Sequence, residues 1–250
     1  MSSLPEQCCT LPPFKTDYKP VGEIFMIKVE GQDELEIYST GSSEAKTALV
    51  AIFDIFGMHN NTLQGADHLA KSSGYRVVLP DFFRGQSWPV DNIPPKEGRP
   101  FLNKWIQSVG SWEKVRPGLL ATIEYLKANG VTTIGAYGFC FGAKKLMQGA
   151  HENLFKSVAL VHPSFFQPED ADNVNVPVAL LPSGGEDQAV MNGYWERIQQ
   201  KPIAKNSIRQ DFLDVHHGFA SARSNWDDPE LAKRARDAYK VMEKFFHDTL

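Results

Sequence analysis

The sequence predicts a single-domain α/β fold, in which a mostly parallel sheet carries helices on both faces. The first observation is a series of short, almost continuous apolar runs, as expected for strands that are buried on both faces. The second is that helix-forming segments separate these runs, which is typical of a parallel sheet. The third is that 250 residues with 42% hydrophobic content can bury a large core, and no internal repeat or step in composition divides the chain. The predicted buried strands are 47–54, 75–80, 131–136, 157–162 and 176–181.

The remaining elements complete this prediction. Residues 22–30 and 34–40 alternate apolar and polar side chains around a turn, which predicts an N-terminal β-hairpin. The proline-rich residues 1–21 are expected to form a surface arm, so that the folded domain is 22–250. Residues 85–100 are rich in proline and glycine, and loops of this length are often lids or binding loops. The other predicted elements are helices at 58–73, 101–109, 112–129, 143–148, 189–200 and 229–247, and a last strand at 208–213.

Composition excludes several classes of partner. The net charge of −4 is mild and there is no basic stripe, so nucleic acid and anionic membranes are poor candidates. No apolar run has the length of a signal peptide or a membrane span. Three cysteines, of which Cys8 and Cys9 are adjacent without CxxC spacing, make no disulfide framework, which favours a reducing, cytoplasmic setting. The histidines lack metal-ligand spacing and no phosphate or dinucleotide motif occurs, so we expect no metal, no cofactor and a small-molecule substrate; no oligomeric state is indicated.

A candidate nucleophile lies in the segment Gly138-Phe139-Cys140-Phe141-Gly142. This is the G-x-S-x-G nucleophile elbow with cysteine in the serine position, and it lies between a predicted strand and a predicted helix. The two glycines remove side chains that would clash in so tight a turn. The thiol of Cys140 would then lie at a helix N-terminus, where the helix dipole favours a thiolate.

The polar residues that follow the other strands should lie near this thiol. Ligands bind beyond the C-terminal ends of the strands in such a sheet, and the partners in an α/β-hydrolase follow in the order nucleophile, acid, histidine. Asp187 follows the strand at 176–181 and His217 follows the last strand, so they are the candidate acid and base. The alternatives are that Asp187 caps the helix near Ala189 and that the histidines face solvent. Three suitable residues after three strand ends favour the catalytic interpretation.

These segments together resemble the dienelactone hydrolase (carboxymethylenebutenolidase-like) family of the α/β-hydrolase fold. The resemblance runs from about Gly22 to the C-terminus and depends on the motifs DIFG, PDFFRG, GFCFG, GGEDQ and HHGF, while the arm with its two cysteines is similar to that of fungal members. It implies a Cys140, His217, Asp187 triad that hydrolyses an ester or lactone through an acyl-thioester. It also implies an oxyanion hole made by the N–H groups of Phe141 and Ile55.

The resemblance further implies three residues that contact the substrate or the thiol. Arg84 matches an arginine of the family and is the first choice for binding a substrate carboxylate, the alternative being a surface arginine paired to Asp81. Bacterial members carry glutamate at the position of Asp54, where it holds the thiol protonated, so we expect Asp54 to interact with the thiol or with Arg84. Bacterial members also place a substrate-binding arginine close after the catalytic histidine, whereas here Ala220, Ser221 and Ala222 intervene between the HHGF motif and Arg223.

Two other classes of function compete with this prediction. Glutamine-amidotransferase-like enzymes also place a cysteine on an elbow, but their base belongs to a His-x-Glu pair, which is absent after the last strands. A non-catalytic small-molecule-binding protein on a hydrolase scaffold is the other alternative. The intact set of Cys140, Asp187 and His217 argues against it, because loss of activity usually removes one of the three.

Overall fold

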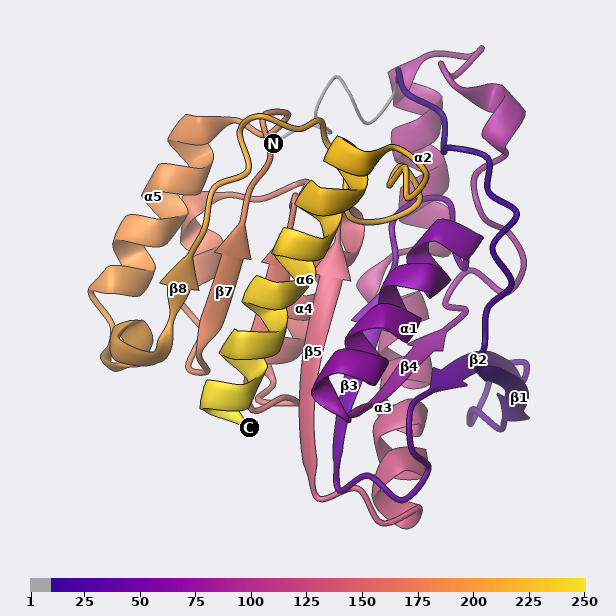
Figure 1. The fold of residues 1–250 in the computed structure, drawn as a ribbon, viewed down its shortest axis with the longest axis vertical. Coiled ribbons are helices and arrows are strands. Elements are labelled where there is room, and N and C mark those ends of the chain that lie inside the picture. The colour runs from indigo at the N-terminus through magenta and orange to yellow at the C-terminus, as the bar shows by residue number, and fades with distance from the viewer. Residues whose placement is uncertain (1–9) are drawn as a thin grey trace.

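An eight-stranded sheet forms the centre of the protein in a computed structural model that describes residues 10–250 (Figure 1). The strands are β1 (Glu23–Ile27), β2 (Leu35–Thr40), β3 (Thr47–Ile52), β4 (Arg76–Pro80), β5 (Thr133–Phe139), β6 (Val158–Val161), β7 (Val178–Leu181) and β8 (Ile208–Arg209). Their order across the sheet is β1-β2-β4-β3-β5-β6-β7-β8. The pairs β1–β2 and β2–β4 are antiparallel and all the others are parallel, which confirms the predicted fold and its N-terminal hairpin.

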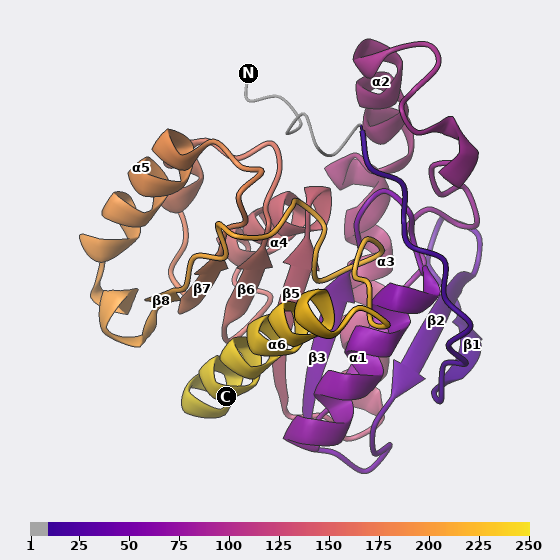
Figure 2. The ribbon, with the colours of Figure 1, turned by 45° about the horizontal axis from the view of Figure 1, so that its top comes forward.

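Helices cover both faces of this sheet (Figures 1 and 2). They are α1 (Asn60–Ser73), α2 (Arg99–Val109), α3 (Trp112–Ala128), α4 (Phe141–His151), α5 (Gln188–Gln199) and α6 (Pro229–Thr249), with short 3₁₀ turns η2 (Val90–Asn92), η3 (Pro168–Ala171) and η4 (Pro202–Asn206). Helices α1 and α6 pack side by side on one face, and α3, α4 and α5 lie on the other. Each predicted helix is present, and α4 begins directly after Cys140.

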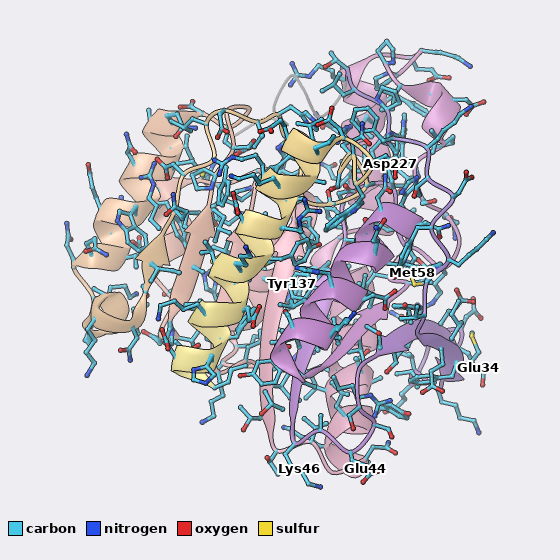
Figure 3. All side chains as sticks on the ribbon, viewed as in Figure 1. Glu34, Glu44, Lys46, Met58, Tyr137 and Asp227 are labelled. Atoms are coloured by element: carbon cyan, nitrogen blue, oxygen red, sulfur yellow. The ribbon has the colours of Figure 1, made fainter. Side chains whose placement is uncertain are left out.

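The central strands are apolar throughout because both of their faces are covered. Side chains alternate between the two faces of a strand. In β3, Leu49 and Ala51 belong to the core beneath α1 and α6, whereas Val50 and Ile52 belong to the core beneath α3 and α4, and all four are fully buried. Tyr137 of β5 lies on the face that α1 and α6 cover, and it is labelled between these two helices in Figure 3. This double burial explains why the strands read as continuous apolar runs.

The parallel strands bring their following loops to one edge of the sheet, the upper edge in Figure 1. Asp227, just before α6, lies toward this edge in Figure 3, whereas Glu44 and Lys46, just before β3, mark the opposite edge. The loops after β3, β4, β5, β6, β7 and β8 therefore converge, which is where the sequence places the candidate site.

Two regions at the margins differ from the central sheet. Strand β8 is much shorter than the predicted 208–213, although an isolated bridge between Ser183 and Phe212 continues its pairing with the chain after β7. Residues 10–21 contain no helix or strand and run along the protein from the α2 end to β1 (Figure 2). Cys8 and Cys9 lie outside the described residues. Within residues 10–250, no helix has both the length and the apolarity to cross a bilayer.

Candidate active site

Cys140 occupies the tight turn that the sequence predicts. Its backbone has φ 55° and ψ −122°, a conformation that non-glycine residues rarely adopt and that is found mainly at functional sites. A side chain at Gly142 would come within 2.3 Å of the carbonyl oxygen of Ile52, and one at Gly138 within 2.7 Å of the Gly142 backbone. The two glycines are thus required by close backbone approach, which presses the turn against the end of β3.

Cys140 and His217 form a buried pair. Both residues are fully buried, and their side chains come from the segments that follow β5 and β8. Burial alone lowers the pKa of His217, but the negative charge and hydrogen bond of Cys140, together with Glu186, outweigh it and raise the pKa to about 9. The imidazolium form is therefore favoured at neutral pH, and it is the natural counter-ion of a thiolate.

Glu186, and not Asp187, is the carboxylate beside this histidine. The Nδ1 of His217 lies 2.6 Å from Oε1 of Glu186, and both side chains are buried. Oε1 also accepts a hydrogen bond of 2.9 Å from the Ser183 hydroxyl, and Oε2 accepts one from the Ser183 backbone N–H. These contacts hold the carboxylate in place. The prediction that Asp187 orients His217 is therefore wrong.

Asp187 instead caps helix α5. It is exposed, and its Oδ1 accepts hydrogen bonds from the N–H groups of Ala189 at 2.9 Å and Val190 at 3.4 Å. Aspartate is among the favoured residues at a helix N-cap. The carboxylate nearest the helix therefore accepts hydrogen bonds from the first N–H groups of α5 and does not contact His217. The signal that would have identified Glu186 was its place one residue before this cap, in the same polar turn.

Two residues after β6, which the sequence analysis did not single out as catalytic, also face the pair. The hydroxyl of Ser164 lies 3.3 Å from the sulfur of Cys140, and both are buried. The ring of His162 packs edge-on against His217 with centroids 4.9 Å apart and stacks on Phe139. Burial, reinforced by His217, lowers the pKa of His162 well below its ordinary value, so this ring is neutral.

The two backbone N–H groups expected to form an oxyanion hole belong to Phe141, in the elbow, and Ile55, in the loop after β3. Phe141 is the first residue of α4, where the N–H groups of the first turn have no acceptor within the helix. Ile55 is in the loop after β3, and across residues 10–250 we find no acceptor for its N–H. Both residues are fully buried.

Asp54 braces the loop that carries Ile55. Its Oδ1 accepts a hydrogen bond from the N–H of Phe56 at 2.9 Å. Its Oδ2 accepts one from the Ser221 hydroxyl at 2.6 Å and one from the N–H of Ala222 at 3.3 Å. Oδ1 thus holds the loop after β3, and Oδ2 joins that loop to the segment that follows His217. The expected contact with Arg84 is not formed.

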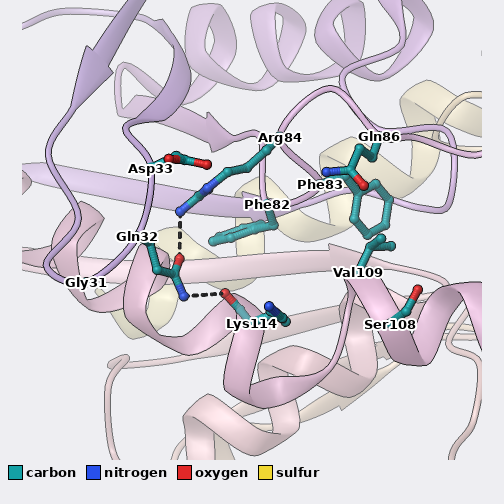
Figure 4. Close-up of a pocket in the computed structure, with 10 residues that line it drawn as sticks. All are labelled: Gly31, Gln32, Asp33, Phe82, Phe83, Arg84, Gln86, Ser108, Val109 and Lys114. Atoms are coloured by element: carbon teal, nitrogen blue, oxygen red, sulfur yellow. Dashed lines mark hydrogen bonds between the residues drawn. The ribbon is translucent and has the colours of Figure 1, made fainter.

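Arg84 lies in a separate pocket of about 580 Å³ (Figure 4). Its Nη2 donates a hydrogen bond of 2.6 Å to Oε1 of Gln32 in the turn of the β1–β2 hairpin. Cys140 and His217 are not among the residues that line the pocket, and the ring of Phe83 at its edge stacks on Phe141 with centroids 5.1 Å apart. The structure therefore contradicts the prediction that Arg84 holds a substrate group beside the thiol.

Arg223 secures the N-terminal segment over the loops at this edge. It is buried, its guanidinium lies 4.7 Å from the ring centre of Phe56, and its Nε donates a hydrogen bond to the carbonyl of Leu11. Asn61 of α1 donates to the carbonyls of Phe14 at 2.8 Å and Ala222 at 3.0 Å. The arm is thus attached to the segment that carries His217, and Arg223 is occupied by it.

No metal site accompanies these residues: among residues 10–250, no group of three or more histidine, cysteine, aspartate or glutamate side chains is placed to hold an ion. The chemistry available to this site is that of a thiol, an imidazole, a carboxylate and backbone donors. That set is suited to nucleophilic acyl transfer.

Comparison with known proteins gives a consistent picture. Residues 35–250 match the family model of the dienelactone hydrolase family. The chain is 34% identical over 227 residues to an uncharacterized AIM2 family protein of Schizosaccharomyces pombe, covering 89% of this chain and 91% of the relative. It is also 34% identical over 227 residues to a carboxymethylenebutenolidase homolog of Mus musculus, covering 85% and 89%. Among solved structures, a putative dienelactone hydrolase from Klebsiella pneumoniae has a TM-score of 0.70 at 18% identity, covering 91% of this chain and 98% of that one.

Proposed function

This chain belongs to the dienelactone hydrolase family, and we propose that it hydrolyses a small ester or lactone with Cys140 as the nucleophile, His217 as the base and Glu186 as the residue that orients the base. Its standing as an ester hydrolase follows from the family. The observation that supports these roles is the buried chain from the thiol through the imidazole to the carboxylate. The same three roles recur in hydrolases of unrelated fold.

The first half of the reaction would acylate the cysteine. His217 holds the proton of the thiol, and the thiolate of Cys140 attacks the acyl carbon of the substrate. The N–H groups of Phe141 and Ile55 then stabilise the oxyanion of the tetrahedral intermediate, each donor contributing roughly 3 kcal/mol. As the C–O bond breaks, His217 gives its proton to the leaving alkoxide, and an acyl-thioester remains on the sulfur.

The second half would return the enzyme to its starting state. His217 removes a proton from a water molecule, which attacks the thioester carbonyl. The same two N–H groups stabilise the second oxyanion. Collapse of that intermediate breaks the C–S bond, releases the carboxylic acid and restores the cysteine. Glu186 accepts the hydrogen bond from Nδ1–H of His217 throughout and keeps the other ring nitrogen directed at the reacting atoms.

Burial of the site bears on the substrate and on the setting. Cys140 and His217 have no exposed surface, so the acyl group must enter the interior of the protein to reach them. Arg84 lies outside this site, and within residues 10–250 Arg223 contacts Leu11 of the arm and Phe56, so neither supports a requirement for a substrate carboxylate. A reducing compartment such as the cytoplasm would keep the thiol active.

The test is turnover of a panel of lactones and aryl esters by the purified protein. Cys140→Ala should abolish hydrolysis while leaving the midpoint of thermal unfolding nearly unchanged, because the side chain is small. Rapid quenching with an active ester, followed by mass spectrometry, should trap an acyl group on Cys140. Hydrolysis by the Cys140→Ala protein at the wild-type rate would refute the assignment.

A further inference from the structure

Two hydrogen bonds join Ser164 to the candidate nucleophile, Cys140. Its hydroxyl lies 3.3 Å from the sulfur of Cys140, and its backbone N–H donates a hydrogen bond of 3.0 Å to the carbonyl of Cys140. The N–H of Cys140 in turn donates to the carbonyl of Val161 at the end of β6. Main-chain bonds therefore hold the β5 and β6 ends in register, and they fix the distance between the hydroxyl and the sulfur.

The backbone on both sides of Ser164 adopts uncommon conformations. His162 has φ 37° and Phe165 has φ 61°, and neither is glycine. Such residues are uncommon in the left-handed region, and they cluster at functional sites because other contacts must outweigh their strain. The loop after β6 is thus bent in a way that leaves Ser164 1% exposed against the thiol.

The direction of the hydrogen bond follows from the number of protons on sulfur. A thiol carries one proton and a thiolate none. Glu186 occupies Nδ1 of His217, and the raised pKa of this ring favours the imidazolium, so the proton of the Cys140 thiol is already on the ring. Toward Ser164, the sulfur is then left with its lone pairs, and the hydroxyl of Ser164 is the donor.

We propose that Ser164 is a further residue of this active site, whose hydroxyl donates a hydrogen bond to the sulfur of Cys140 and thereby favours the thiolate. The inference rests on the proposed role of Cys140 as nucleophile. A hydrogen bond to a charged acceptor is stronger than one to a neutral acceptor, so the donor stabilises the thiolate more than the thiol. It also holds the sulfur at one position on the elbow.

The charged and titratable groups near the sulfur of Cys140 have roles that differ from the neutral donor role proposed for Ser164. His217, from the segment after β8, is the counter-ion, and Glu186, after β7, lies behind it. His162, after β6, is neutral and contacts His217. Asp54, after β3, directs its carboxylate to Ser221. The positive charge of Arg223 acts on His162 from the segment after β8. Ser164 adds a donor without adding a charge.

The test measures thiolate formation directly. In a Cys8→Ser/Cys9→Ser background, Cys140 is the remaining cysteine of the chain, and its alkylation rate by iodoacetamide is followed from about pH 5 to 10. Ser164→Ala should move the midpoint of the alkylation profile upward by roughly one pH unit. Ser164→Thr, which keeps the hydroxyl, should retain most of the wild-type midpoint.

The matched control is Ser157→Ala. Ser157 is as buried as Ser164, but its hydroxyl accepts a hydrogen bond from Thr249 at 2.8 Å, away from the elbow. This variant should leave the midpoint unchanged. Folding of each variant is checked by thermal unfolding. A folded Ser164→Ala protein whose midpoint stays or falls would overturn the proposal.

A second measurement covers the case in which Ser164→Ala does not fold. In the wild-type protein labelled with ¹³C-serine, the Cβ resonance of Ser164 should shift with the same pH midpoint as the alkylation of Cys140. A Ser164 resonance that does not respond at that pH would contradict the proposal. Neither readout needs ester turnover, so a shifted midpoint in a protein that hydrolyses no ester would leave this inference standing and remove the proposed function.

Discussion

The Nδ1 of His217 lies 2.6 Å from Oε1 of Glu186, and both side chains are buried. The neighbouring carboxylate of Asp187 is exposed and caps α5. Two adjacent acids therefore have different tasks, one in the interior of the site and one at a helix end. Substituting each acid separately therefore distinguishes the residue that orients His217 from the residue that caps α5.

Glu186→Gln should lower kcat for an active ester by at least about 100-fold, because an amide no longer fixes the histidine tautomer. Asp187→Asn changes kcat by less than about 3-fold, since asparagine is also a good N-cap. The measurement is kcat for both variants beside the wild type. An equal loss of kcat in the two variants would mean that Asp187 contributes to catalysis as much as Glu186 does.

Cys140→Ala should lower the pKa of His217, which is raised to about 9 in the wild type. Burial favours the neutral ring, and the negative charge of Cys140 is what most opposes it, so its removal shifts the balance toward neutral imidazole. Glu186 remains and limits the fall. Histidine NMR titration of the two proteins gives the comparison, and an unchanged His217 pKa would mean that the thiol is neutral at rest.

Asp54→Asn should destabilise the fold by about 1–3 kcal/mol, because an amide cannot accept all three hydrogen bonds and presents its own N–H groups to the donors. Ser221→Ala should cost less, since one of the three bonds is removed. Urea unfolding of both single variants and the double variant measures the coupling between them. Strict additivity would show that the buried contact contributes little.

Arg84→Ala should leave the ratio of kcat/KM for a carboxylate-bearing ester and its neutral analogue within about 2-fold of the wild type, because Arg84 binds Gln32 in another pocket. Arg84→Lys serves as the charge-conserving control. A preference for the charged ester that disappears only in Arg84→Ala would show that this side chain reaches the substrate in a different conformation.

Most of the fold was predictable because a strand that is buried on both faces is a continuous apolar run in the sequence. The runs at β3 and β7 are apolar throughout, and the hairpin before them alternates. The last strand was overestimated because Arg209 and Asp211, which form an ion pair of 2.7 Å, lie in a stretch that otherwise resembles a strand. Polar pairing near the sheet edge ended the strand sooner than its apolar residues suggested.

The site was predictable where the backbone dictates the residue type, and less so where side-chain direction decides. The glycines of the elbow are demanded by contacts below 3 Å, so the motif identifies Cys140. The choice between Glu186 and Asp187 depends on where α5 begins, to within one residue. Arg84 also has a φ of 50°, a left-handed conformation that is uncommon for arginine and that the sequence does not predict.

The attachment of the arm has an evolutionary consequence. Arg223, Asn61 and Asn60 donate to the carbonyls of Leu11, Phe14 and Tyr18, so the domain recognises the main chain of the arm at these points. Every residue type supplies a carbonyl, and selection on the exposed positions 11 and 14 should therefore be weak. The constraint falls on the three donors, whose replacement loosens the segment whatever its side chains are. Related chains should accordingly vary in the arm while keeping the residues that hold it.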